Sequence, residues 1–172
     1  MNTGRDALSL ALGSALQVRG WMLTTAESCT GGGIAEAVTA TAGSSGWFDR
    51  GFVTYSNAAK IEMLGVSAAT LDRCGAVSEA TVQEMARGAL AHSRAQVAVA
   101  VSGIAGPGGG SSDKPVGLVC LAWALAGQPA LSTTRHFSGD RAAIRQQTVI
   151  AALQGLIMLT QTPAANPTSH LL

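Results

Sequence analysis

Two glycine-rich segments carry most of the hydroxyls and free amides with which this chain could do chemistry. Residues 26–33 read Ala-Glu-Ser-Cys-Thr-Gly-Gly-Gly and follow the β-favouring run at 21–25. Residues 102–110 follow the continuous apolar run at 97–101. Because ligands of open α/β sheets bind beyond the carboxyl ends of strands, the two loops predict one small-molecule site between them. Neither loop has a Walker or dinucleotide pattern, so a phosphorylated ligand other than ATP or NAD fits better.

The remaining catalytic candidates are Ser45, Tyr55 and Lys60, which lie in a turn, at a strand end and at a helix start. Tyr55 and Lys60 can point at one place if the chain turns sharply at residues 56–57. A lysine desolvated there would have a lowered pKa and could deprotonate a serine. The alternative, which spacing alone favours, is that Tyr55 packs and Lys60 is solvated.

Cys29 and Arg141 are the other candidates. Cys29 adjoins Ser28 and could itself be the nucleophile, but no base lies near it in sequence, which favours a small buried side chain. Arg141 opens the last helix, where the helix dipole prefers anions. An arginine at this position could bind a ligand phosphate or carboxylate, or form an ion pair with Glu27 or Asp140. An exposed surface ion pair is an equally good explanation.

The histidines and cysteines predict neither a metal site nor a cofactor. No neighbouring motif completes a Ser–His–Asp arrangement, and the cysteine count is odd, with spacings that suit neither disulfides nor zinc. These residues are His92, His136, His170, Cys29, Cys74 and Cys120.

Composition excludes several classes of protein. Of the 172 residues, 47% are apolar and 12% charged, and the net charge is +1 without a basic run, so nucleic-acid binding has no electrostatic support. No uninterrupted apolar stretch reaches the roughly 18 residues that would span a membrane, and no signal-peptide layout precedes the first helix. We expect a cytoplasmic, reduced protein. The high apolar content and the long last helix suggest a homodimer.

Periodicity and turn signals predict an α/β fold: a layered α/β/α domain with a mixed sheet and an antiparallel hairpin near the C-terminus. A single domain is expected at 1–161, followed by a flexible tail at 162–172. The expected helices are 6–18, 34–42, 58–64, 81–91 and 142–159, and the expected strands are 21–25, 52–55, 97–101, 116–125 and 131–137.

Six motifs, in order and in one register, resemble the CinA family over roughly residues 5–160. They are Thr-Ala-Glu-Ser-Cys-Thr-Gly-Gly at 25–32, Gly-Ser-Ser at 43–45, Gly-Phe-Val-Thr-Tyr-Ser-Asn at 51–57 with Lys60, Gly-Ala-Val-Ser at 75–78, Ser-Gly-Ile-Ala-Gly-Pro at 102–107 and Phe-Ser-Gly-Asp-Arg at 137–141. The resemblance is to the amidohydrolase domain, which forms the C-terminal part of two-domain relatives.

This resemblance implies hydrolysis of the carboxamide of nicotinamide mononucleotide, without a metal, to nicotinate mononucleotide and ammonia. Lys60 would deprotonate a serine, the serine would form an acyl-enzyme, and Tyr55 would hold the lysine or relay a proton to departing ammonia. Loop amides would stabilise the oxyanion. Both Ser45 and Ser28 are candidates for the nucleophile, and Ser45 is preferred because it is closer in sequence to Tyr55 and Lys60.

The expected substrate contacts come from the two glycine-rich loops and the last helix. Ser28 and Thr30 would line the pocket, while Arg141 and the 102–110 loop would take the phosphate or ribose, although the 26–33 loop could also be the anion site. The full set is Glu27, Thr30, Gly31, Ser102, Gly103, Gly106 and Arg141. Two rival hypotheses remain: an amidase of another small amide, and a non-catalytic ligand- or partner-binding module linked to competence or DNA damage.

Overall fold

A computed structural model describes residues 3–161, so the predicted tail at 162–172 lies outside the described residues. The helices are α1 (Thr3–Arg19), α2 (Gly33–Thr39), α3 (Asn57–Leu64), α4 (Ala68–Cys74), α5 (Glu79–Ala91) and α6 (Arg141–Gln161), with a 3₁₀ turn, η1 (Ser44–Gly46). The strands are β1 (Leu23–Glu27), β2 (Phe48–Val53), β3 (Val97–Gly103), β4 (Leu118–Leu125) and β5 (Leu131–His136).

The five strands form one mixed sheet in the order β2-β1-β3-β4-β5. β1 is parallel to both β2 and β3, whereas β3, β4 and β5 are successively antiparallel. The predicted α/β/α layering with a C-terminal hairpin is therefore confirmed. The second helix is shorter than predicted, because the segment after Thr39 turns into η1.

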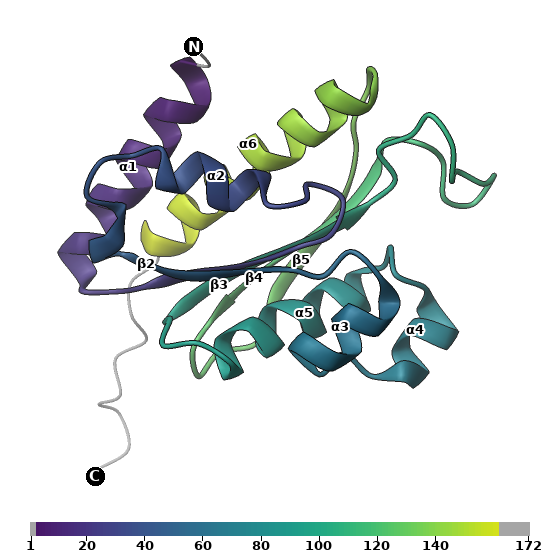
Figure 1. The fold of residues 1–172 in the computed structure, drawn as a ribbon, viewed down its shortest axis with the longest axis horizontal. Helices are drawn as coiled ribbons and strands as arrows, with labels where there is room; N and C mark the ends of the chain where they lie inside the picture. The colour runs from purple at the N-terminus through teal and green to yellow at the C-terminus, as the bar shows by residue number, and fades with distance from the viewer. Residues whose placement is uncertain (1–2, 162–172) are drawn as a thin grey trace, which may run out of the picture.

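Helices cover both faces of the sheet, with α1, α2 and α6 on one side and α3, α4 and α5 on the other (Figure 1). A hydrophobic core lies on each face of the sheet. Strand β3 contributes to both cores, because successive side chains of a strand point to opposite faces. Val97, Val99 and Val101 pack in the core beside α1 and α6. Ala98 and Ala100 pack in the core beside α5, and their small size lets that helix lie close to the strand.

Helix α6 is the one helix within residues 3–161 that is long and apolar enough to cross a membrane by length and composition. In the fold it is a core helix, since Ile144, Ala152, Leu153 and Leu156 are buried against the sheet. Helices of this kind pass the same length test, so α6 is weak support for a membrane span.

Strand register brings the two glycine-rich loops together. Glu27 pairs with Val101 at the carboxyl ends of β1 and β3. The next residue of each chain segment is a serine, and the amide of Ser28 donates to the carbonyl of Val101 at 3.0 Å. Ser28, directly after β1, and Ser102, still within β3, therefore lie next to each other at this edge of the sheet, which brings the two loops together as the order of elements predicted.

Candidate active site

The side chains of Ser28 and Lys60 meet beyond the carboxyl end of β1. Lys60 Nζ lies 3.0 Å from Ser28 Oγ, 2.9 Å from the carbonyl oxygen of Thr54 and 3.3 Å from that of Tyr55. Both side chains are buried, at 1% exposure for Lys60 and 8% for Ser28. A nucleophile in hydrogen-bond contact with a buried amine is the arrangement that activates a serine hydroxyl.

The chain positions Lys60 by a sharp turn out of the sheet. The amide of Thr54 donates to the carbonyl of Glu27, which keeps β2 paired to its last residue. Ser56 then caps α3 by accepting from the amide of Ala59 at 3.0 Å, so the helix starts directly above the strand end. Lys60, on the first turn of α3, consequently points back toward Ser28.

The surroundings of Lys60 favour a neutral amine. Burial lowers the pKa of Lys60 from its ordinary 10.5, while the nearby Cys29 thiol has the opposite, smaller effect. No carboxylate pairs with Lys60 within the described chain. A neutral amine has two N–H donors for the two carbonyls and one lone pair, which would then face the hydroxyl of Ser28.

A cavity of about 210 Å³ opens in front of this pair, and its wall comes from five segments of the described chain. The lining residues are Ser28, Cys29, Tyr55, Lys60, Ala76, Val77, Ser102, Gly103, Ala105 and Arg141. Next to Ser28, the amide of Cys29, which lines the cavity, and the amide of Thr30, which follows it in the chain, donate to no main-chain carbonyl within residues 3–161. Amides that follow a nucleophilic serine are donors of the kind that stabilises an oxyanion.

Tyr55 and Arg141 form the rim of the cavity. Arg141 Nη2 donates to the hydroxyl of Tyr55 at 3.2 Å, and Nη1 donates to the carbonyl of Gly106 at 2.9 Å. The hydroxyl of Tyr55 is therefore directed to Arg141, whereas only its carbonyl contacts Lys60. Tyr55 therefore helps to hold the lysine, as one of the two expected roles had it, but through its carbonyl and not its hydroxyl. Its alternative role as a proton relay stays a prediction.

Within one chain, the structure does not bring Ser45, the preferred nucleophile, to Lys60. Ser45 is exposed in η1, which leads into the amino end of β2, whereas Thr54 and Lys60 lie beyond its carboxyl end. Strands rise about 3.3 Å per residue, so the length of β2 separates Ser45 from the lysine. Proximity in sequence was misleading because a strand lies between the two residues.

Glu27, Thr30 and Gly31 do not line the cavity, contrary to their expected role as substrate contacts. The buried carboxylate of Glu27 accepts from the Thr30 hydroxyl at 2.6 Å and from the amides of Ile34 and Ala35 at 2.8 and 3.0 Å. Glu27 thus accepts hydrogen bonds from amides at the start of α2 that have no partner within the helix, because the N-cap residue Gly32 has no side chain to do so. Gly31 provides a left-handed turn, with φ of +59°.

Gly106 contacts the rim arginine but is not part of the cavity wall. Ala76, Val77 and Ala105 do line the cavity, and sequence reasoning gave the first two no individual role, whereas Ala105 belongs to the 102–110 loop that was expected to bind substrate. Two of them lie in the Gly-Ala-Val-Ser motif at 75–78, which was the available signal. Cys29 also lines the cavity, but burial raises the pKa of its thiol to about 11, which makes it a poor nucleophile.

No group of three or more His, Cys, Asp or Glu side chains gathers anywhere in residues 3–161 in a way that could hold a metal ion. The polar side chains that line the cavity are instead hydroxyls, a thiol, the amine of Lys60 and the guanidinium of Arg141. This set can activate a serine and bind an anion at the rim.

Comparison with known proteins gives the family. The model of the CinA C-terminal domain matches residues 5–160. Proteins named nicotinamide-nucleotide amidohydrolase PncC are 58% identical over 147 residues in Enterobacter agglomerans, covering 86% of this chain and 90% of the relative, and 56% identical over 149 residues in Escherichia coli K12, covering 87% and 90%. The crystal structure of the competence/damage inducible protein CihA from Agrobacterium tumefaciens has a TM-score of 0.89 at 52% identity, covering 92% of this chain and 96% of that one. This chain belongs to the CinA C-terminal domain family.

Proposed function

We propose that this protein is an amidohydrolase that converts nicotinamide mononucleotide and water to nicotinate mononucleotide and ammonia, with Ser28 as nucleophile and Lys60 as base. The observation that carries the proposal is the 3.0 Å contact between Lys60 Nζ and Ser28 Oγ in a buried setting. The substrate follows from the relatives named nicotinamide-nucleotide amidohydrolase at 56–58% identity.

The first half-reaction forms an acyl-enzyme. Neutral Lys60 takes the proton of Ser28 as Oγ attacks the carboxamide carbon, and the carbonyl oxygen becomes an oxyanion within reach of the amides of Cys29 and Thr30. Lys60, now an ammonium, returns that proton to the amide nitrogen. The carbon–nitrogen bond breaks, ammonia leaves, and the nicotinoyl group remains esterified to Ser28.

The second half-reaction repeats the same proton transfers with water. Lys60 takes a proton from a water molecule as its oxygen attacks the ester carbon, and Oγ of Ser28 recovers the proton when the ester bond breaks. The product is a carboxylic acid that ionises at neutral pH. The carbonyls of Thr54 and Tyr55 hold the amine in place throughout both steps.

The cavity supports one orientation of the substrate. Its volume of about 210 Å³ suits the pyridine ring and carboxamide, which must reach Ser28 at the floor. The ribose phosphate would then extend to the rim, where Arg141 supplies a guanidinium and the 106–110 segment supplies glycine amides. The 26–33 loop therefore faces the nicotinamide end, and the rim takes the anion.

The deciding experiment measures ammonia release from nicotinamide mononucleotide by the purified chain in the presence of a chelator. Turnover by wild type, lost in Ser28→Ala and kept in Ser45→Ala, is the expected result. Absence of turnover with retained ligand binding would instead favour a binding module. Turnover unaffected by removal of the substrate phosphate or by Arg141→Ala would indicate an amidase of another small amide.

A homodimer in the cytoplasm is the remaining part of the proposal. Its support is the 47% apolar content and the 21-residue α6, in which 39% of the most apolar window is buried within one copy. Light scattering should give twice the 17.3 kDa mass of one chain. A mass equal to one chain would refute the dimer without affecting the proposed chemistry.

A further inference from the structure

Residues 106–114 of the glycine-rich loop between β3 and β4 are joined to other elements by two side-chain hydrogen bonds, one near each end. At one end Arg141 donates to the carbonyl of Gly106. At the other end Lys114 Nζ donates to the carbonyl of Cys74, the last residue of α4, at 2.6 Å. The proposed chemistry uses the first attachment, through the rim arginine, but leaves the second without a role.

Lys114 is itself fixed within a closed turn. Its amide donates to the hydroxyl of Ser111 at 3.1 Å, and its carbonyl accepts from the amide of Ser111 at 2.8 Å. The ammonium is partly buried against α4, and a Cβ at position 75 would lie 3.0 Å from Nζ. Gly75 therefore leaves room for the ammonium and also adopts a φ of +77° at the end of the helix.

The residues that follow Gly75 line the cavity. Ala76 and Val77 form part of its wall, and both belong to the short connection between α4 and α5. The first residue of this connection is held from the start of α5, because the hydroxyls of the N-cap Ser78 and of Thr81 donate to the carbonyl of Gly75 at 3.2 and 2.7 Å. Lys114 holds the adjacent carbonyl of Cys74.

We propose that Lys114 is a positioning residue for the substrate: it fastens the glycine-rich loop to the α4–α5 connection and so sets the wall formed by Ala76 and Val77. This proposal deepens the proposed amidohydrolase function and rests on it. A charged donor on a main-chain carbonyl gives a stronger hydrogen bond than a neutral pair. Without the Lys114 hydrogen bond, the loop and the α4–α5 connection would have to become ordered when substrate binds. The cost of that ordering weakens substrate binding, while Ser28 and Lys60 stay in place for the chemical step.

The test compares Lys114→Met, which keeps most of the side-chain length, with Lys114→Arg, which keeps a charged donor. The matched control is Arg73→Met, which removes an exposed cation from the last turn of α4 without touching the carbonyl of Cys74. Steady-state kinetics with nicotinamide mononucleotide and amide hydrogen exchange of the intact protein are measured for all four proteins. Peptides from β4 serve as the internal reference for exchange.

We expect Lys114→Met to raise KM by about five- to tenfold with kcat within about twofold, as loss of one such hydrogen bond predicts. Exchange should accelerate in peptides covering 74–78 and 106–114 but not in β4. Lys114→Arg should recover most of the KM, and Arg73→Met should match wild type.

Two outcomes would overturn the proposal. Unchanged KM in Lys114→Met, with or without faster exchange, would leave Lys114 a purely structural residue. Equal loss of kcat in Lys114→Met and Lys114→Arg would place it in the chemical step. Failure of the wild-type protein to release ammonia would refute the proposed function instead, and the exchange data would still decide whether Lys114 joins the two segments.

Discussion

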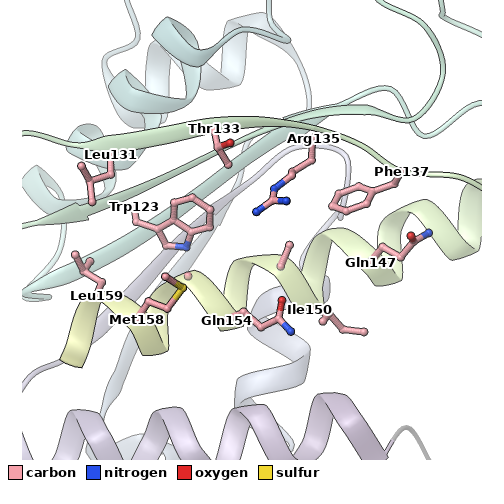
Figure 2. A pocket seen from close by; sticks show the side chains of 12 residues that line it. Trp123, Leu131, Thr133, Arg135, Phe137, Gln147, Ile150, Gln154, Met158 and Leu159 are labelled. Carbon is pink, nitrogen blue, oxygen red and sulfur yellow. The ribbon is translucent and has the colours of Figure 1, made fainter. Parts of the chain in front are cut away.

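Two of the hollows in the described part of the chain differ in character, and the smaller of these two is the active-site candidate. The larger, of about 590 Å³, is a groove between β5 and α6 with Trp123, Phe137 and Ile150 in its wall (Figure 2). It does contain a hydroxyl, on Thr133, and a guanidinium, on Arg135, but no lysine or acid lines it. The smaller cavity places its hydroxyl 3.0 Å from a buried amine. The cavity is the better active-site candidate because it brings together two groups that can exchange a proton, although the groove has the larger volume.

The largest effect should come from exchanging one hydroxyl in each hollow. Ser28→Ala removes the proposed nucleophile and should lower kcat by roughly 10⁴-fold or more, as loss of a catalytic serine does elsewhere. Thr133→Val in the groove should leave kcat unchanged. Ammonia release assays measure both, and equal residual activities would remove the distinction between the hollows.

The next largest effect should come from replacing the cationic side chain in each hollow, Lys60 in the cavity and Arg135 in the groove. Lys60→Met should lower kcat by about 10²- to 10⁴-fold, the usual contribution of a general base, whereas Arg135→Met in the groove should have no kinetic effect. The activities of the two variants and of wild type, measured side by side, test this. A fast Lys60→Met variant would contradict its assignment as base.

The pH dependence of the wild-type enzyme gives an independent check on Lys60. Burial lowers its pKa from 10.5, and the neutral form is the base, so kcat/KM should rise with pH through the lowered pKa and then level off. Between that lowered pKa and 10.5 the unfolded chain binds the extra proton, so the free energy of unfolding should also rise with pH there. A rate that falls as pH rises through this range would mean that the ammonium form acts.

A smaller and purely structural effect is expected in the groove. Gly155 of α6 lies so close to Trp123 that an added Cβ would overlap its ring, and the indole donates to the carbonyl of Ala152 at 3.0 Å. Gly155→Ala should lower the free energy of unfolding by about 1–3 kcal/mol, as overpacking does. Thermal melting measures this, while KM should stay at the wild-type value. A raised KM would show that the groove communicates with the active site.

The smallest effect is expected from Leu131→Thr at the rim of the groove. Leu131 is 60% exposed on the edge strand, and threonine has the β-branched side chain that strands favour. The free energy of unfolding should change by no more than about 0.5 kcal/mol. Light scattering of the same variant sharpens the comparison, because a change in mass would show that the groove is covered by a second copy in solution.

Much of this arrangement could be predicted from local sequence. The alternating Val and Ala of β3 indicated a strand covered on both faces, and the glycine-rich segments after β1 and β3 indicated the edge at which a ligand would bind. The hairpin of β4 and β5 followed from two segments of strand length, 116–125 and 131–137, on either side of the turn signal at 127–129. These features depend on neighbours within a few residues, which a sequence displays directly.

The roles of Ser45 and Glu27 could not be predicted in this way. Whether a loop lies at the amino or carboxyl edge of a sheet depends on strand direction, and Ser45 precedes a strand that Thr54 follows. The role of Glu27 depends on whether its carboxylate turns to the solvent or back to the amides of α2. Both choices are settled by three-dimensional packing rather than by residue type.

Two of the three partners of Lys60 are main-chain oxygens, those of Thr54 and Tyr55. Amino-acid exchange at either position leaves a carbonyl in place, so side-chain scanning would assign these residues no share in holding the lysine. Their contribution becomes visible only when the backbone itself is altered, for example by an ester linkage introduced through chemical synthesis, because an ester carbonyl is a weaker acceptor. For the same reason, substitutions can accumulate at 54 and 55 without loosening this anchor.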